Sequence, residues 1–435
     1  MENQFVSALK NMGISQLNPM QKAMLEQFAA HPHLQLIAPT GSGKTLAYLL
    51  PLVKQLDPEK EGVQALIVSP SRELALQIEK VFKALRTNFK INSVYGGHPW
   101  QTELNNFRHT PAVLVGTPGR ILDHMDQESF DATAVQYLIL DEFDKSLEFG
   151  FLGEISNMLF HLSGVAQKVL VSATDEIEIP EFLKFQQSHK LDFSETENKE
   201  RFTFYEVNAA PEEKTEKLCD LLSLIGEEST IVFCNHKDAV ARLEENLKKR
   251  GLITVAYHGD LNQHDRERAL IKFRNESCRM MITTDLAGRG LDIDGVKHVV
   301  HYQLPRKAAT FTHRNGRTAR VDRDGKVYIF PAEEEIDYLP QGLVTFDFPE
   351  RIPIPAHPQW ETIFFSRGKK DKVNKIDLVG LCCQQGGLEK SELGKIDVLD
   401  FCAFVAVKRG MGKPLVRQLQ DKKIKKRTFK LGLAR

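Results

Sequence analysis

The segment LQLIAPTGSGKTLAYLLP, residues 34–51, joins an apolar run typical of a strand to a glycine-containing loop and then to a helix-like run. Gly41 and Gly43 let backbone N–H groups approach a phosphate closely, and the start of the helix adds the positive end of its dipole. Lys44 supplies a charge for the β- and γ-phosphates of a nucleotide, and Thr45 supplies a hydroxyl for Mg²⁺. The predicted phosphate-binding loop comprises Ala38, Pro39, Thr40, Gly41, Ser42, Gly43, Lys44 and Thr45.

Apolar runs like the first part of this segment recur along the chain and alternate with amphipathic segments of helical length. They lie at residues 34–38, 65–69, 112–116, 137–141 and 168–173, and again at 230–234, 255–259, 280–284, 298–302 and 326–330. Continuous apolar strands that alternate with helices indicate parallel sheets covered on both faces. We therefore expect an α/β fold with two tandem parallel-sheet domains, residues 1–195 and 203–345, joined by the polar linker 193–203.

A third unit, residues 360–435, follows a proline-rich segment at 348–360 that we expect to be extended. Its predicted order is a strand (362–366), a helix (372–383), two strands (394–398 and 401–407), a short helix (414–419) and a last strand (427–433). This β-α-β-β-α-β order resembles a ferredoxin-like α+β module of the RRM kind.

Charge is distributed unevenly between these parts. The whole chain has 58 Lys+Arg and 58 Asp+Glu, but residues 361–435 hold 18 of the basic and only 8 of the acidic residues. A small basic module on an acidic body suggests a polyanion-binding appendage, although a solvated, lysine-rich surface would give the same count.

Composition narrows the class of protein. The chain is 42% hydrophobic and 27% charged, which is typical of globular domains and argues against disorder. It has no apolar run of membrane-spanning length and no signal-peptide pattern, so we expect a cytoplasmic protein without a membrane partner. Its six cysteines form no C-x-x-C pair, which favours idle thiols in a reducing compartment.

A second motif follows the apolar run 137–141. The run ends in Asp141 and Glu142, and a carboxylate at the carboxyl end of a parallel strand suits Mg²⁺ coordination. Asp141 is the candidate metal ligand, and Glu142 is placed to orient and deprotonate the attacking water. Arg317 and Arg320, three residues apart in the second domain, would share a helix face and reach a γ-phosphate bound to the first domain. A basic surface helix is the alternative.

Together these motifs resemble those of the DEAD-box RNA helicases over about residues 5–345. In the first domain the matching stretches are GI (13–14), PMQ (19–21), APTGSGKT (38–45), PSRELA (70–75), GG (96–97), TPGR (117–120), DEFD (141–144) and SAT (172–174). In the second domain they are VFCN (232–235), QHDR (263–266), TTDLAGRGLD (283–292) and HRNGRTAR (313–320). The resemblance implies RecA-like domains that bind ATP and Mg²⁺, hydrolyse ATP and unwind RNA.

The resemblance also implies roles for single residues. Gln21 would read adenine and Asp292 would join the ATP site, while Ser172, Thr174 and His313 would couple the nucleotide site to the RNA site. RNA would be gripped mainly through its sugar–phosphate backbone, which carries no base information. The candidate RNA contacts in the two helicase domains are Ser71, Arg72, Gly97, Thr117, Gly119, Arg120, Arg266, Thr284 and Asp285.

Some residues depart from the family pattern. Phe143 replaces a small residue and should point away from the metal-binding carboxylates. Asn315 and Ala319 replace an aliphatic residue and a glycine beside the two arginines. The upstream aromatic that stacks on adenine is either Phe5 or missing, and the helical spacing of Phe5 with Leu9 and Met12 favours missing.

The last 75 residues resemble the RNA-binding domain of DbpA-type helicases, which tethers those enzymes to large-subunit ribosomal RNA. The stretch 400–407 falls where an RRM places its stacking residues, here Cys402 and Phe404, so stacking would be partial. A basic cluster could instead engage phosphates; it comprises Lys422, Lys423, Lys425, Lys426 and Arg427.

The sequence thus predicts an ATP-dependent RNA helicase that remodels structured RNA, with ribosomal RNA and pre-ribosomal particles as expected partners during ribosome assembly. A DNA motor with the same two domains and an RNA clamp that hardly hydrolyses ATP are the alternatives.

Overall fold

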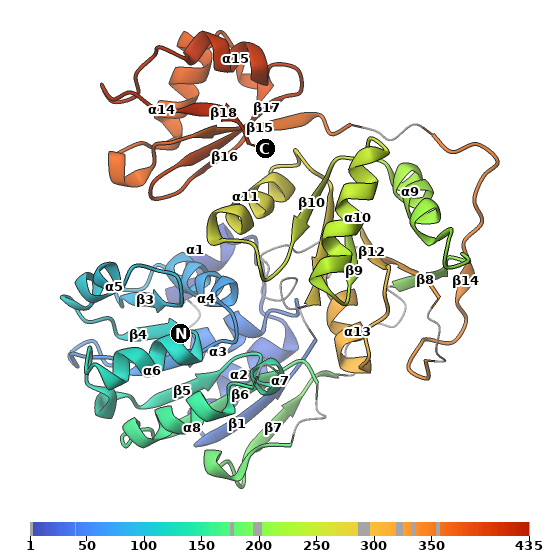
Figure 1. Cartoon of the computed structure of the whole chain (residues 1–435). Coiled ribbons are helices and arrows are strands. Elements are labelled where there is room, and N and C mark those ends of the chain that lie inside the picture. Colours follow the sequence, from blue (N-terminus) through green and yellow to red (C-terminus); the bar gives the residue numbers. More distant parts are fainter. Residues whose placement is uncertain are drawn as a thin grey trace. The chain divides into compact units, whose positions relative to one another are not determined.

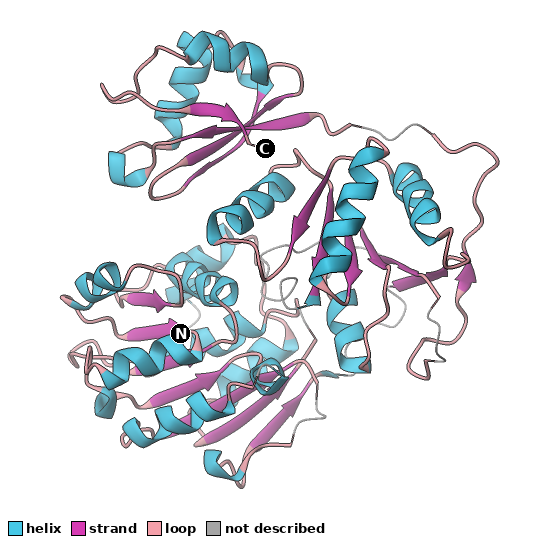
Figure 2. Cartoon of the chain, viewed as in Figure 1, coloured by secondary structure: helices cyan, strands magenta, loops and turns pink. Residues whose placement is uncertain are grey.

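A computed structural model of the chain describes residues 3–39, 41–148, 150–174, 178–194, 202–285, 296–318, 325–331, 336–353 and 357–434. Contacts divide the chain into two compact units, one formed mainly by the first 200 residues and the other by nearly all the rest (Figures 1 and 2). The second unit holds a second parallel sheet and a small C-terminal domain. In the described part of the chain, no helix is both long and apolar enough to cross a membrane.

The first unit is built on a parallel sheet of seven strands. Their spatial order is β3 (Ile91–Val94), β4 (Val113–Gly116), β2 (Ala65–Val68), β5 (Tyr137–Leu140), β6 (Gln167–Ser172), β1 (His33–Ile37) and β7 (His189–Asp192). All five strands predicted for this domain are present. The sequence analysis missed the two edge strands, β3 and β7, because INSV and HKLD are short and carry polar residues.

Helices cover both faces of this sheet because neighbouring residues of each strand point to opposite sides. On one face Leu36 and Ile67 belong to a core with α1 (Asn3–Asn11), α2 (Pro19–Gln27), α3 (Lys44–Gln55) and α4 (Arg72–Ala84). On the other face Leu66 and Leu138 belong to a core with α6 (Pro118–Asp126) and α8 (Leu152–His161). The short helices α5 (Trp100–Phe107) and α7 (Phe143–Glu148) complete this unit.

The second parallel sheet also has seven strands. Their order is β10 (Thr254–Tyr257), β11 (Met280–Thr284), β9 (Thr230–Cys234), β12 (His298–His301), β13 (Gly325–Ile329), β8 (Phe202–Glu206) and β14 (Val344–Thr345). The helices described with it are α9 (Lys214–Ile225), α10 (Lys237–Lys249), α11 (Gln263–Arg274) and α13 (Ala308–Asn315). The five predicted strands are again confirmed, and β8 begins inside the range that we expected to be linker.

The C-terminal domain has a four-stranded antiparallel sheet. Its order is β16 (Leu393–Val398), β17 (Ala403–Lys408), β15 (Trp360–Phe365) and β18 (Leu431–Leu433), with α15 (Gly412–Leu419) between β17 and β18. The expected β-α-β-β-α-β order is confirmed. The first helix differs from its prediction: α14 (Lys375–Gly380) starts only after the capping residue Asn374 and passes into a π-helical turn at Leu381–Gln385.

Candidate functional site

The predicted phosphate-binding loop lies between β1 and α3. Gly41 and Gly43 adopt φ of +82° and +91°, which only glycine adopts without strain. The Lys44 ammonium donates to the carbonyl oxygens of Ala38 at 2.7 Å and Pro39 at 2.9 Å. These carbonyls hold the lysine inside the loop, the position from which it can bind an incoming phosphate. Thr40 lies outside the described residues.

A buried carboxylate stands beside this loop. Asp141 follows β5 and is 2% exposed, and its Oδ2 accepts a hydrogen bond from the Tyr48 hydroxyl at 2.8 Å. Burial and the adjacent Glu142 raise the pKa of Asp141 to about 6, although Tyr48 and Lys44 oppose that shift. A bound divalent cation would favour the ionised form of this carboxylate. Asp141 and the Thr45 hydroxyl therefore fit Mg²⁺, which prefers oxygen ligands.

The sequence analysis did not single out Tyr48. It lies one helical turn after Lys44 on α3, and its fully buried side chain joins the helix of the phosphate loop to the carboxylate of β5. The spacing of four residues from Lys44 was the signal that could have identified it.

Glu142 has an unusual backbone conformation. Its φ is +45°, and its N–H donates to Oδ1 of Asp141 at 2.9 Å. Non-glycine residues in this region are uncommon and are over-represented at functional sites. Phe143, which follows, is 1% exposed and lies in the apolar core, as expected from its place after the carboxylates.

Side chains at the start of helix α2 also hydrogen-bond to the phosphate-binding loop. Asn18 caps α2 and donates to the carbonyl oxygen of Ser42 at 2.9 Å, and Gln21 donates to that of Gly43 at 3.4 Å. A Cβ atom at position 43 would lie 2.6 Å from the Gln21 amide nitrogen and would displace it, and the φ of +91° disfavours any residue but glycine there. The role of Gln21 in reading adenine stays a prediction. Phe5 is buried in the core on α1 and is not available to stack on a base.

The serine–alanine–threonine motif borders the same loop. Ser172 ends β6, and its carbonyl oxygen accepts from the N–H of Ala38 at 3.1 Å. Its hydroxyl donates to the carbonyl oxygen of Thr174 at 2.7 Å and accepts from the N–H of that residue. The turn is thus hydrogen-bonded to Ala38, the first residue of the phosphate-binding loop.

The candidate RNA contacts of the first domain come after β2, β3 and β4 in the chain. These three strands are neighbours in the sheet. Ser71 caps α4 through its hydroxyl, which accepts from the N–H of Leu74. Arg72 starts that helix and lies beside Gly97, where an added Cβ would meet its guanidinium at 3.1 Å. Thr117 and Gly119 lie at the start of α6, after β4. The structure thus gathers these residues at the carboxyl edge of three adjacent strands.

A buried network of side chains holds Arg120 in place. Its Nε donates to Glu103 at 2.7 Å, and its guanidinium lies 4.6 Å from the centre of the Trp100 ring. Glu103 is 1% exposed, and burial would raise its pKa. The pKa is nevertheless lowered, because hydrogen bonds from His124, Arg120 and the Tyr95 N–H act together with the charge of Arg120. This buried network was not predicted, and it positions Arg120 whether or not the residue contacts RNA.

A buried arginine organises the second domain. Arg314 on α13 is 2% exposed and donates to both oxygens of Asp285, at 2.5 and 2.7 Å. It also donates to the side chain of Asn235 at 2.9 Å and to the carbonyl oxygen of Gln303 at 2.6 Å. One side chain therefore ties together the ends of β11, β9 and β12. The RNA candidate Asp285 is engaged by Arg314, and its neighbour Thr284 is buried.

The predicted arginine pair is only partly described. The expectation that Arg317 and Arg320 share a helix face is wrong for Arg317, because α13 ends at Asn315 and Gly316 is its cap. The chain then turns into a short bridge between Val296 and Thr318. Arg317 is 5% exposed and His313 is 4% exposed. Arg320 and Asp292 lie outside the described residues.

Asn315, which replaces the aliphatic residue of the family pattern, forms a hydrogen bond inside the second domain. Its Oδ1 lies 2.8 Å from Nε2 of the buried His301, and burial lowers the pKa of His301 to about 3. That imidazole is therefore neutral and can donate to the asparagine. The substitution therefore adds a buried hydrogen bond within the second domain.

The C-terminal basic cluster forms a tight turn. Ile424 and Arg427 pair through two backbone hydrogen bonds, and Lys425 and Lys426 form the turn with φ of +51° and +65°. Lys425 pairs with Asp377 at 2.8 Å and Arg427 with Asp371 at 2.8 Å. Among the described residues, no acidic group is within ion-pair distance of three exposed lysines, Lys422, Lys423 and Lys426.

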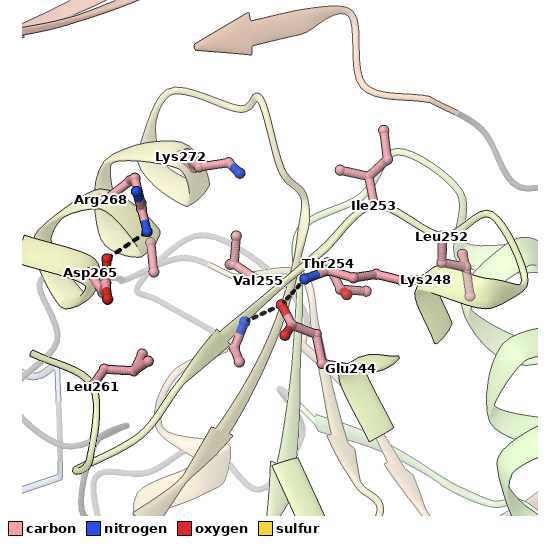
Figure 3. Close-up of a pocket in the computed structure, with 12 residues that line it drawn as sticks. Glu244, Lys248, Leu252, Ile253, Thr254, Val255, Leu261, Asp265, Arg268 and Lys272 are labelled. Carbon is pink, nitrogen blue, oxygen red and sulfur yellow. Dashed lines mark hydrogen bonds and ion pairs between the residues drawn. The ribbon is translucent and has the colours of Figure 1, made fainter. Parts of the chain in front are cut away.

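A cavity of about 500 Å³ on the second domain belongs to none of the predicted sites (Figure 3). Helix α11 lines one side of it, with Asp265 and Arg268 paired at 2.5 Å, and Glu244 of α10 pairs with Lys248 at 2.7 Å. Arg266, the RNA candidate on α11, instead donates to the carbonyl oxygen of Gly259.

Comparisons with known proteins find matches to three successive parts of the chain. The sequence matches the family descriptions "DEAD/DEAH box helicase" over residues 18–181, "Helicase conserved C-terminal domain" over 213–322 and "DbpA RNA binding domain" over 362–432. The chain is 33% identical to "ATP-dependent RNA helicase DbpA" of Escherichia coli (strain K12). The matched region covers 98% of this chain and 96% of that protein.

Two further comparisons cover less of this chain. "ATP-dependent RNA helicase CshA" of Listeria monocytogenes is 32% identical over 84% of this chain and 71% of its own length. The structure of S. cerevisiae Dbp5 bound to RNA and ADP BeF3 has a TM-score of 0.68 at 27% identity, covering 76% of this chain and 88% of that one.

The arginine at the centre of the second domain gives a first prediction. Arg314→Lys keeps the charge but loses the planar fork that reaches Asp285, Asn235 and Gln303 together, so the free energy of unfolding should fall by about 2–4 kcal/mol. Chemical denaturation measures this change. Arg306→Lys, at an exposed arginine near the same helix, is the control and should have no effect. Equal stability of the two variants would show that Arg314 is not the organising contact.

The strained lysine turn gives a second prediction. Lys426→Gly relieves the positive φ and should stabilise the C-terminal domain by about 1 kcal/mol, whereas Lys426→Gln removes the same charge and keeps the strain. Thermal unfolding compares the two. If glycine gave no more stability than glutamine, the left-handed conformation would not be present in solution.

Proposed function

The chain belongs to the DEAD/DEAH box helicase family, whose DEAD-box members are ATP-dependent RNA helicases, and we propose that it remodels structured RNA by closing its two helicase domains around ATP and RNA. The family membership follows from 33% identity to a helicase over 98% of the chain. The observation that best supports the mechanism is the pairing of buried Asp141 with the helix of the phosphate loop through Tyr48 at 2.8 Å.

We assign the nucleotide chemistry to the carboxyl edge of β1, β5 and β6. Lys44 would bind the β- and γ-phosphates, and the Asp141 carboxylate and Thr45 hydroxyl would hold Mg²⁺, which would neutralise charge on the phosphates. Glu142, fixed by its N–H bond to Asp141, would orient the attacking water and accept its proton. Arg317 and Arg320 of the second domain would stabilise charge on the transferred phosphoryl group, with Asp292 and Gln21 completing the site.

We assign RNA binding to two regions. In the helicase domains the loops after β2, β3 and β4 and the residues Arg266, Thr284 and Asp285 would hold the sugar–phosphate backbone. For Asp285 to accept hydrogen bonds from RNA 2′-hydroxyls, it would use lone pairs that Arg314 leaves available. Ser172, Thr174 and His313 would carry the change at the nucleotide to these loops.

The C-terminal domain would supply affinity for a particular RNA. Its match to the DbpA RNA-binding domain and the resemblance to DbpA-type helicases support large-subunit ribosomal RNA as the target, and hence a role in ribosome assembly in the cytoplasm. Pre-ribosomal particles would then be the partners. Lys422, Lys423 and Lys426 are the side chains most available for phosphates.

The assignment of Glu142 gives a third prediction. Glu142→Gln should keep ATP and RNA binding but lower kcat for ATP hydrolysis by about 10²–10⁴-fold, because the amide cannot accept the proton of water. Steady-state ATPase measurements with saturating RNA test it. Glu128→Gln is a matched control, since Glu128 is an exposed glutamate of the same domain that also has a positive φ, +49°. Near-normal hydrolysis by the Glu142 variant would refute the assignment.

The basic turn gives a fourth prediction. Replacing Lys422, Lys423 and Lys426 together by alanine should weaken binding to structured RNA and flatten its dependence on log salt concentration by a slope of about 2–3, because three phosphate contacts are lost. Filter-binding titrations at several salt concentrations measure both. The control replaces exposed lysines of the helicase domains, Lys54, Lys83 and Lys249. An unchanged slope in the tail variant would place the RNA elsewhere.

A further inference from the structure

The cavity of about 500 Å³ in the second helicase domain lies beside the edge of the parallel sheet (Figure 3). Its lining comes from α10, from α11 and from β10, which is the edge strand, together with the loops on either side of that strand. None of the residues proposed above to bind ATP or RNA lines it. The cavity is therefore a candidate site for a different ligand.

A buried hydroxyl in the lining of this cavity lacks a hydrogen-bond partner. Thr254, at the start of β10, is 4% exposed, and within the described part of the chain no group donates to its Oγ1 or accepts from it. Buried polar side chains are nearly always hydrogen-bonded, so an unsatisfied one calls for a bound molecule. Thr254 is thus the first group of the cavity that a ligand would satisfy.

The second such group is a lysine. Lys272 lies in the last turn of α11, and Figure 3 shows its side chain extending from the helix into this space. In the parts of the chain that the structure describes, no acidic group lies within ion-pair distance of its ammonium. The other cations of the lining are paired: Lys248 with Glu244 at 2.7 Å, and Arg268 with Asp265 at 2.5 Å.

Both carboxylates of the lining are also engaged by neighbouring groups. Oε1 of Glu244 accepts from the N–H of Ala256 at 3.0 Å, on the open edge of β10. Oδ2 of Asp265 accepts from the side chain of Asn262 at 2.9 Å. With three cations and two carboxylates, the lining carries a net charge of +1. The charge that remains without a counterion is that of Lys272.

The electrostatic surroundings of Lys272 favour an anion. Burial lowers the pKa of Lys272, and the charges of Arg268 and Lys248 act in the same direction against the opposing effects of Cys278 and Glu244. A carboxylate placed beside the ammonium would stabilise its charged form and offset this lowering. One negative charge is enough to balance the lining, and a dianion would be repelled by the two carboxylates already present.

The remaining side chains of the cavity are apolar. They are Leu252, Ile253, Val255, Leu261 and Ala269. Cavities of about 300–1,000 Å³ with apolar walls and a few polar groups are typical of sites for small molecules. The lining therefore suits a molecule that combines one negative charge with a hydrocarbon part.

We propose that this cavity binds a small carboxylic acid with an apolar body. Lys272 pairs with the carboxylate, the Thr254 hydroxyl hydrogen-bonds to the same molecule, and the apolar side chains hold its hydrocarbon part. The site is separate from the proposed ATP and RNA sites, and the inference does not depend on the proposed function. A bound ligand contacts α10, β10 and α11 together.

Site-resolved labelling of lysines tests the proposal on the wild-type full chain, with hexanoate as the probe. Limited reductive methylation needs an accessible, unprotonated amine, so a carboxylate bound at Lys272 should slow it there. We expect saturating hexanoate to lower methylation of Lys272 by about fivefold, measured by mass spectrometry. Lys249, an exposed lysine of α10, should not change. Hexanamide, inorganic phosphate and sodium chloride at equal concentration are the controls and should give no protection.

Three results of this experiment would overturn the proposal. Equal methylation of Lys272 with and without hexanoate would show that no carboxylate binds there. Protection by hexanamide or phosphate as strong as that by hexanoate would show that the cavity does not select a carboxylate with an apolar body. Loss of the protection when a structured RNA hairpin is added at saturation would show that the cavity belongs to the RNA site.

Two variants at Thr254 separate binding from folding. Thr254→Val keeps the shape of the side chain but removes the unsatisfied hydroxyl, so the free protein should melt at the same or a higher temperature. Its affinity for hexanoate, measured by isothermal titration calorimetry, should nevertheless fall about fivefold. Thr254→Ser keeps the hydroxyl and should bind within about twofold of the wild type. Equal affinity of the two variants would contradict the role given to the hydroxyl.

A variant at Lys272 tests the charge. Lys272→Gln should weaken hexanoate binding by about tenfold, with Lys249→Gln as the matched control. RNA-stimulated ATP hydrolysis by both variants should equal that of the wild type, because neither lysine belongs to the proposed ATP or RNA sites. Undiminished hexanoate affinity in Lys272→Gln would refute the inference. If the wild type hydrolysed no ATP with RNA while hexanoate still protected Lys272, the proposed function would fail and this inference would stand.

Discussion

Both candidate sites of the first domain depend on one constraint: the carboxyl ends of all the strands of its parallel sheet lie at the same edge. All its strands point the same way, so the loops that follow them emerge together. The loops after β1, β5 and β6 bring Lys44, Asp141 and Ser172 together, and the loops after β2, β3 and β4 carry the RNA candidates. The candidate nucleotide and RNA residues therefore occupy adjoining stretches of one edge. The hydrogen bond from Ala38 to Ser172 and the bond from Tyr48 to Asp141 make the nucleotide stretch a single unit.

Much of this arrangement could be predicted from sequence because it depends on local patterns. Continuous apolar runs identified all ten of the predicted parallel strands, and the glycine spacing located the phosphate loop. Strands such as β3 (INSV) and β14 (Val344–Thr345) were missed because they are short and only partly apolar, so pairing with a neighbour determines them. The end of α13 was missed because it depends on the bridge between Val296 and Thr318, which pairs the segment before the helix with the segment after it.

Side-chain pairing across distant segments could not be predicted. Arg314 was passed over in favour of Arg317, although it joins the ends of three strands and engages Asp285. The Glu103 network that holds Arg120 unites residues from two helices. Phe404 was weighed as a base-stacking residue, and only the fold shows that Ile271, more than a hundred residues earlier, covers it. In each case the sequence shows which residue is present but not which distant residue its side chain contacts.

The central claim of the proposed function is that each helicase domain would hold only part of the ATP-cleaving site and that RNA would bring the parts together. The most direct test is the rate of ATP hydrolysis by the wild-type protein as RNA is titrated at saturating ATP. The account predicts a low rate without RNA that rises and saturates as RNA is bound. Equal turnover with and without RNA would contradict it, because the first domain would then cleave ATP unaided.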